Sequence, residues 1–195
     1  MLLLADTSRY TRGAISVVAT LAQLAAAIAL LAVAGGGVPG VWPDGVGVYL
    51  VGDWPAPFGI VLVVDRLAAV MLTLTAVLGL ATLIYALARW DRAGVHFHSL
   101  FQFLLMGLNG AFLTGDLFNL FVFFEVLLAA SYGLLLHGSG VARVSAGLQY
   151  IAVNLVASFL LLISIALIYG VTGTLNMADL APVSYTHLTL PTTPY

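Results

Sequence analysis

One glutamate stands in the middle of a long apolar segment. The segment Phe118–Tyr132 reads FNLFVFFEVLLAASY, and Glu125 is its only carboxyl side chain. An ionised acid near the middle of a membrane costs roughly 2.5–3.5 kcal/mol on insertion scales. The side chain can avoid this cost by taking up a proton, because desolvation favours the neutral form, or by pairing with a cation from another helix. Glu125 is therefore our candidate for exchanging protons or binding a cation. The alternative is a neutral glutamate that clasps two helices.

Further polar side chains, on the Glu125 segment and on neighbouring apolar segments, are candidates for a proton path. These are Asn109, Tyr132, Asn154 and Ser158. Tyr132 lies two turns from Glu125 on the same face of a helix, and Asn154 and Ser158 share a face four residues apart. We expect these groups to hold water near Glu125. Ordinary hydrogen bonds between packed helices are the alternative.

The sequence predicts neither a cofactor nor a metal. The glycines of residues 35–40 match a dinucleotide-binding spacing, but Pro39 interrupts them and no strand precedes them. His96 and His98 lack an evident third ligand for a metal. Cysteine is absent, so the chain has no thiolate ligand and no disulfide framework.

The composition indicates the environment in which these side chains act. Of the 195 residues, 62% are hydrophobic and 7% are charged, whereas soluble domains are about 45–50% apolar and about 25% charged. Lipid is the solvent that tolerates so much apolar surface, so we predict an all-α membrane protein, a polytopic bundle of transmembrane helices. The apolar segments are too long for barrel strands and do not alternate. The formal charge of −2 argues against a nucleic-acid partner.

Five segments are apolar enough for spanning helices. They cover about residues 14–34, 59–88, 97–113, 117–136 and 147–170. Residues 35–57 are rich in glycine and proline and are expected to form a loop, and Asp116 is placed to cap the helix that follows it. Residues 1–13 are interpreted as a remnant of a preceding helix or cytoplasmic segment, and 183–195 as a non-native tail. The membrane domain is therefore assigned to 14–182.

The arginines predict an orientation. Five of the six lie in segments that five crossings would place on one side, namely Arg9, Arg12, Arg89, Arg92 and Arg143. The positive-inside rule then places this side in the cytoplasm. We expect a multi-pass protein of the cell membrane.

Three segments carry a family resemblance. LNGAFLTGDLFNLFVFFEVLLAASYGLL (Leu108–Leu135) closely resembles the D subunit of the Mrp-type multisubunit sodium/proton antiporters, and GDWPAPFGIVLVVDRLAAVM and LIYGVTGTLNMADLAP resemble the same family. The resemblance covers nearly all of Ala14–Pro182. It implies a secondary transporter subunit rather than an enzyme, in a bundle of about fourteen helices built from inverted repeats. This chain would supply the second to sixth of those helices.

The same resemblance implies a function. The family's essential glutamate falls on Glu125, and its partner is a lysine on a later helix, whereas this chain contains no lysine. We therefore expect part of an antiporter subunit that moves protons through a mid-membrane glutamate. Its expected partners are the other subunits of an antiporter complex, protons and sodium ions, and the lipid bilayer. The alternative is an antiporter-like, proton-pumping subunit of NADH:quinone oxidoreductase or of a membrane-bound hydrogenase.

Overall fold

The structure is a computed structural model that describes residues 9–38, 40–54, 59–94, 96–138 and 140–181. Its helices are α1 (Arg9–Ala34), α2 (Arg66–Ala88), α3 (Phe97–Leu113), α4 (Leu117–Leu135) and α5 (Val141–Thr172). Two short strands, β1 (Gly47–Leu50) and β2 (Val61–Val64), and two short 3₁₀ helices, η1 (Val51–Asp53) and η2 (Trp90–Ala93), lie between them. Residues 1–8 and the predicted tail, 183–195, lie outside the described residues.

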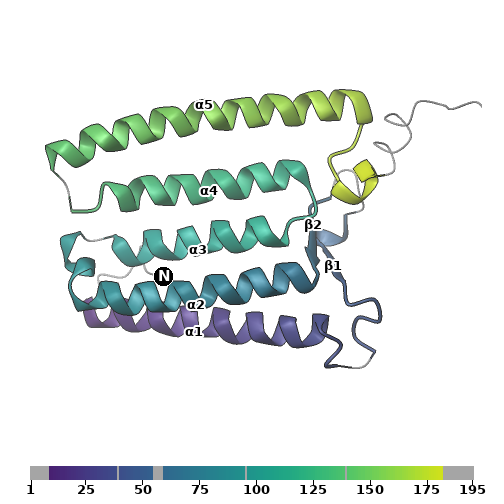
Figure 1. The fold of residues 1–195 in the computed structure, drawn as a ribbon, viewed down its shortest axis with the longest axis horizontal. Coiled ribbons are helices and arrows are strands. Elements are labelled where there is room, and N and C mark those ends of the chain that lie inside the picture. The colour runs from purple at the N-terminus through teal and green to yellow at the C-terminus, as the bar shows by residue number, and fades with distance from the viewer. Residues whose placement is uncertain (1–8, 39, 55–58, 95, 139, 182–195) are drawn as a thin grey trace, which may run out of the picture.

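The helices lie side by side in chain order, and each runs antiparallel to the one before it (Figure 1). Helix α1 packs along α2 and also contacts α3, while α5 forms the far edge of the bundle. In the described part of the chain, four helices, α1, α2, α4 and α5, are long and apolar enough to cross a membrane. The 17 residues of α3 rise about 25 Å, and α3 lies alongside its neighbours. The predicted all-α membrane bundle is confirmed.

The second helix is shorter than the sequence suggests. A helix was expected over 59–88, but α2 begins at Arg66, and Val61–Val64 form β2. This strand pairs antiparallel with Gly47–Leu50, which lies in the segment expected to be a loop. Three of the four β2 residues are valines, and β-branched side chains favour extended backbone. The loop prediction is therefore wrong for β1, and the helix prediction is wrong for β2.

Other helix limits differ less from expectation. Helix α1 begins at Arg9, so residues 9–13 belong to it rather than to a separate preceding segment. Helix α5 covers Val141–Thr172 and is longer than the expected 147–170. The bounds of α3 match the prediction, and α4 ends one residue earlier than predicted.

The apolar core lies between α2 and α3. It consists of Leu83, Ala86, Phe97, Phe101 and Leu105, all buried. The rings of Phe97 and Phe101 stack with their centroids 5.7 Å apart. Val17 of α1 and Leu134 of α4 pack against this cluster, which ties α1 and α4 to the central pair of helices.

Backbone hydrogen bonds join the helix ends on the strand-bearing side of the bundle. The Gly115 amide donates to the Val61 carbonyl at 2.8 Å, and the Met177 amide donates to the Gly115 carbonyl at 2.9 Å. The Leu117 amide donates to the Leu175 carbonyl at 3.0 Å. We call these five residues the backbone clasp. It connects β2, the α3–α4 turn and the segment after α5.

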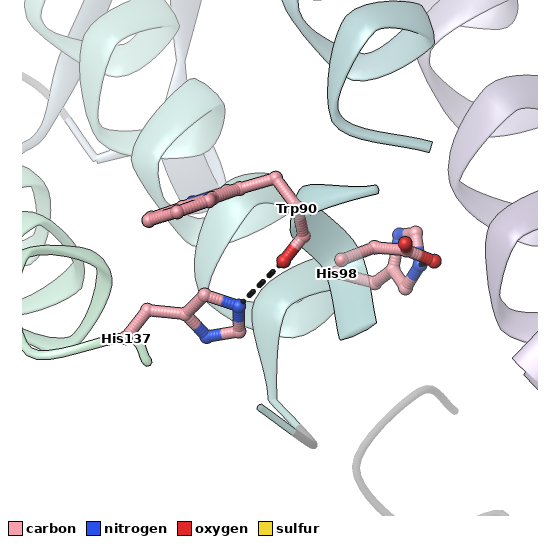
Figure 2. Close-up of polar contacts among 4 residues, drawn as sticks. Trp90, His98 and His137 are labelled. Atoms are coloured by element: carbon pink, nitrogen blue, oxygen red, sulfur yellow. Dashed lines mark hydrogen bonds and ion pairs between the residues drawn. The ribbon is translucent and has the colours of Figure 1, made fainter. Parts of the chain in front are cut away.

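Side chains make the corresponding connection at the opposite end. The His137 Nε2 atom lies 3.1 Å from the Trp90 carbonyl oxygen (Figure 2). Arg143 donates to the His137 carbonyl, and its guanidinium carbon lies 5.1 Å from the centre of the Trp90 ring. These three residues, which we call the side-chain staple, fasten η2 to the turn between α4 and α5.

Candidate functional site

Helix α4 carries Glu125 near its middle. The helix begins after Asp116, whose Oδ1 accepts a hydrogen bond from the Asn119 amide at 2.9 Å, as the sequence predicts. The Asn119 side chain also donates to Thr114 Oγ1 at 3.0 Å. This buried cap fixes the start of the helix. Glu125 then lies one residue before the middle of the 19-residue helix.

Glu125 is the only acidic residue in the five helices. Its side chain is half-buried, and its Oε1 atom is enclosed with no hydrogen-bond partner among the described residues. A buried acceptor without a partner costs about 1–3 kcal/mol, and more when it is charged. The described residues therefore leave this Glu125 oxygen without a hydrogen bond.

The contact between α3 and α4 shows which way Glu125 faces. A Cβ atom built on Gly107 would lie 2.7 Å from the Leu127 backbone nitrogen, and one built on Gly110 would lie 2.1 Å from the Phe123 ring. Phe123 and Leu127 thus face α3 at close range. Glu125 is two residues from each, or about 200° around the helix axis. It therefore faces away from α3.

On this other face, α4 meets α5. The rings of Tyr132 and Tyr150 pack edge to face with their centroids 5.7 Å apart, and Tyr132 lies within electrostatic reach of Glu125. The two helices are antiparallel (Figure 1). Moving seven residues toward the start of α4, from Tyr132 to Glu125, therefore corresponds to moving about seven residues toward the end of α5 from Tyr150. Glu125 therefore lies at about the depth of Ser158, which is buried.

Asn154 lies between Tyr150 and Ser158 on the same stripe of α5. Its Nδ2 atom donates to the Tyr150 carbonyl at 2.8 Å, so this amide is bonded within its own helix. Three of the four path residues proposed from the sequence, Tyr132, Asn154 and Ser158, thus lie along the α4–α5 contact.

Asn109, the fourth proposed path residue, lies on the side of α3 that faces away from α4. The facing pairs Gly107–Leu127 and Gly110–Phe123 place Asn109 at about the depth of Glu125. Asn109, however, lines a cavity between α1, α2 and α3 together with Gln23, and its Oδ1 is buried without a hydrogen-bond partner among the described residues. The structure therefore separates Asn109 from the other three path residues.

Polar residues of α1 were absent from the predicted site. Ser16, Thr20 and Gln23 occur at steps of four and three residues, and each is buried or half-buried. That spacing was the available signal, because it places three polar side chains on one face of an apolar helix. Within the described residues, no group of three or more His, Asp or Glu side chains could hold a metal ion.

Comparisons with known proteins agree with this architecture. The family described as "NADH:quinone oxidoreductase/Mrp antiporter, TM" matches residues 114–191. A protein of Rhizobium meliloti (strain 1021), named as the D subunit of a probable K(+)/H(+) antiporter, is 62% identical over 90% of this chain and 32% of its own length. The D subunit of a Na(+)/H(+) antiporter from Alkalihalophilus pseudofirmus (strain ATCC BAA-2126 / JCM 17055 / OF4) is 48% identical over 72% of this chain and 29% of its own length.

A solved structure shows the same helix arrangement. A chain in the structure of the Mrp complex from Dietzia sp. DQ12-45-1b superposes with a TM-score of 0.79 at 41% identity, covering 88% of this chain and 32% of that one. The present chain thus spans about a third of the length of the curated relatives it matches. It is a multi-pass membrane protein, and it belongs to the family of antiporter-like membrane subunits that includes the D subunit of the Mrp-type antiporters.

Proposed function

We propose that this chain forms part of a proton-translocating subunit of a multisubunit monovalent cation/proton antiporter, and that Glu125 takes up and releases the proton. The observation that carries the proposal is the Glu125 Oε1 atom, which is buried without a partner among the described residues near the middle of α4. A carboxyl group so placed is neutral when protonated and needs a countercharge or water when ionised. Alternating between these two states is what proton transfer requires.

The countercharge comes from outside these 195 residues in this proposal. Arg66 and Arg143 lie at the first and third positions of their helices, and Arg12 lies in the first turn of α1. Arg89 and Arg92 follow α2. All of them are far along the helix axes from the centre of α4. The lysine implied by the family resemblance would have to lie on another helix of the full-length protein.

Sodium is the ion proposed for exchange, and potassium is the competing candidate. One relative is named for K⁺ and the other for Na⁺, so the assay must compare the two ions. A proton-pumping subunit of NADH:quinone oxidoreductase is the second candidate function, because the matching family covers both kinds of complex. The other subunits of such a complex are its proposed partners.

The test replaces Glu125 in the full-length protein, assembled in its complex in inverted membrane vesicles. Glu125→Gln removes the titrating proton but keeps the size and polarity of the side chain. We expect it to abolish cation-driven proton movement, measured with a pH-sensitive dye after addition of Na⁺ or K⁺. Glu125→Asp keeps a carboxyl group and should retain part of the activity.

The matched control is Asp44→Asn, which neutralises an exposed acid in the segment before β1 and should leave the rate unchanged. Assembly of each variant is checked by co-purification of the other subunits. An assembled Glu125→Gln complex with unchanged exchange would assign Glu125 a structural role and would overturn the proposal.

A further inference from the structure

A cavity of about 150 Å³ lies between α1, α2 and α3. Its wall is mostly apolar, with Leu72 and Ala76 from α2, but two amide side chains also line it. These are Gln23 of α1 and Asn109 of α3. The Gln23 Oε1 and Asn109 Oδ1 atoms are both buried, and neither has a hydrogen-bond partner among the described residues.

The chemistry of these two oxygens restricts what can occupy the cavity. Both are acceptors, so an occupant must donate hydrogen bonds. A lipid chain or an apolar side chain would leave both acceptors unpaired, which is unfavourable in a buried site. Water donates twice, and its share of liquid volume is about 30 Å³, so the cavity has room for a small cluster. Water is the ligand that fits both the size and the polarity.

Hydrogen bonds extend from this cavity along the contact between α1 and α3. Gln23 Nε2 donates to Gln102 Oε1 at 3.5 Å. Gln102 Nε2 in turn donates to Thr20 Oγ1 at 3.1 Å and to the Ser16 carbonyl at 3.3 Å. Ser16 and Thr20 are fully buried. The polar side chains therefore form a continuous series inside the bundle rather than on its surface.

The series continues toward the end of the bundle that carries η2. The Ser16 Oγ atom is buried without a hydrogen-bond partner among the described residues. One turn earlier, a Cβ atom built on Gly13 would lie 4.0 Å from His98 Nε2. His98 Nε2 itself lies 3.9 Å from Asp91 Oδ2. His98 projects beside η2, separate from the bond between His137 and Trp90 (Figure 2). Asp91 and Gly13 border an open pocket at this end.

We propose that α1 and α3 enclose a hydrated polar track that leads from this end of the bundle to a water-binding cavity between Gln23 and Asn109. From His98 to Asn109 the track climbs about 16 Å along α3, which is about half of a 30 Å hydrocarbon core. It ends at the depth of Glu125 but is separated from it by the α3–α4 contact. The track is thus a second route for water and protons, beyond the role proposed for Glu125.

The first test looks for the water itself in the unaltered complex. A cryo-EM map of the full-length protein in its complex, at a resolution that shows ordered water, should contain density within hydrogen-bond distance of Gln23 Oε1 and Asn109 Oδ1. A dry cavity, or one filled by a lipid chain or an apolar side chain, overturns the proposal. This measurement needs no variant, so its result does not depend on whether a substitution folds.

The second test asks whether the track affects transport, and it uses a matched pair of threonines. Thr20 and Thr82 both donate to the carbonyl four residues earlier in their own helices. Thr20 also accepts from Gln102 inside the track, whereas Thr82 is exposed on α2. Threonine-to-valine substitution removes the hydroxyl group in both places and keeps the shape of the side chain.

We expect Thr20→Val to slow proton movement about tenfold, the factor that corresponds to about 1.4 kcal/mol, and Thr82→Val to leave it unchanged. Equal rates for two assembled variants would overturn a transport role for the track. The outcome is distinguishable from that for Glu125. Water in the cavity together with an unaffected Glu125→Gln complex would refute the proposed function alone, and a dry cavity with an inactive Glu125→Gln complex would refute the track alone.

Discussion

Gly107 of α3 and Leu127 of α4 bring their backbones into direct contact, because a Cβ atom on Gly107 would lie 2.7 Å from the Leu127 nitrogen and 2.9 Å from its Cα. Backbone atoms cannot swing aside as the end of a side chain can. We therefore predict that Gly107→Ala forces α3 and α4 apart and lowers the free energy of unfolding by about 1–3 kcal/mol. Thermal melting of the purified full-length protein in detergent measures this loss.

The control is Gly170→Ala in α5, where nothing lies within 4 Å of the added methyl group among the described residues. There the substitution should be neutral or stabilising by up to about 1 kcal/mol, because alanine favours a helix over glycine. Equal melting temperatures for the Gly107→Ala and Gly170→Ala proteins would contradict the close contact between α3 and α4.

Asp116 should contribute to stability as the cap of α4. Asp116→Ala leaves the Asn119 amide without its acceptor, and we expect it to cost about 1 kcal/mol of unfolding free energy. Asp116→Asn keeps an oxygen at the capping position and should melt close to the unaltered protein. If the asparagine variant is as unstable as the alanine variant, the negative charge matters rather than the hydrogen bond.

Arg143 should not be replaceable by lysine without loss. The planar guanidinium lies over the Trp90 ring while donating to the His137 carbonyl, and a lysine ammonium cannot combine the two in the same geometry. We predict that Arg143→Lys lowers the unfolding free energy by about 1 kcal/mol. Arg89→Lys, on an exposed arginine, is the matched control and should cause no change in melting temperature.

The Tyr132 hydroxyl should affect transport more than stability. Tyr132→Phe keeps the ring that packs against Tyr150 but removes the hydroxyl group near Glu125. We expect proton movement in vesicles to slow about fivefold, as for the loss of one hydrogen bond of about 1 kcal/mol, with little change in melting. Tyr85→Phe, on a tyrosine that is 80% exposed, should transport normally. Equal rates for the two variants would exclude the Tyr132 hydroxyl from the path.

The orientation of the bundle can be tested with single cysteines, because this chain has none of its own. Arg12, Arg92 and Arg143 lie at one end of the bundle, and the positive-inside rule places that end in the cytoplasm. A thiol reagent that cannot cross membranes should therefore label Ala178→Cys from outside intact cells and should not label Val141→Cys, both at exposed positions. The full-length protein would need its other cysteines replaced. The reverse pattern would invert the orientation.

Sequence patterns predicted the helices whose ends carry a local signal. The Thr114–Asp116 turn and the cap at Asp116 define where α3 ends and α4 begins, and the structure agrees within a residue at each limit. The strand Val61–Val64 was missed because it is a short apolar run next to a helix. The periodicity of so short a run does not distinguish a strand from a helix. Only its pairing with Gly47–Leu50, a tertiary contact, identifies it.

The candidate site was partly predictable for a related reason. Glu125 is conspicuous because an acidic side chain within an apolar membrane segment is costly whichever way its helix is turned. The grouping of Asn109 with Glu125 depends on how α3 is rotated against α4, and the sequence does not encode that rotation as a simple repeat. The close packing at Gly107 and Gly110 sets it, and it turns Asn109 toward α1.

The contacts of the backbone clasp and of the side-chain staple depend to different degrees on side-chain identity. Every residue has a carbonyl group, and every residue except proline has an amide N–H. The bonds from Gly115 to Val61 and from Leu117 to Leu175 can therefore persist when side chains change. The staple at the other end also uses backbone carbonyls as acceptors, but its two donors are the side chains of His137 and Arg143, and its ring contact requires Trp90. Over evolutionary time, the clasp can keep its bonds while most side chains around it change, whereas a change at Trp90, His137 or Arg143 removes one of the staple's contacts.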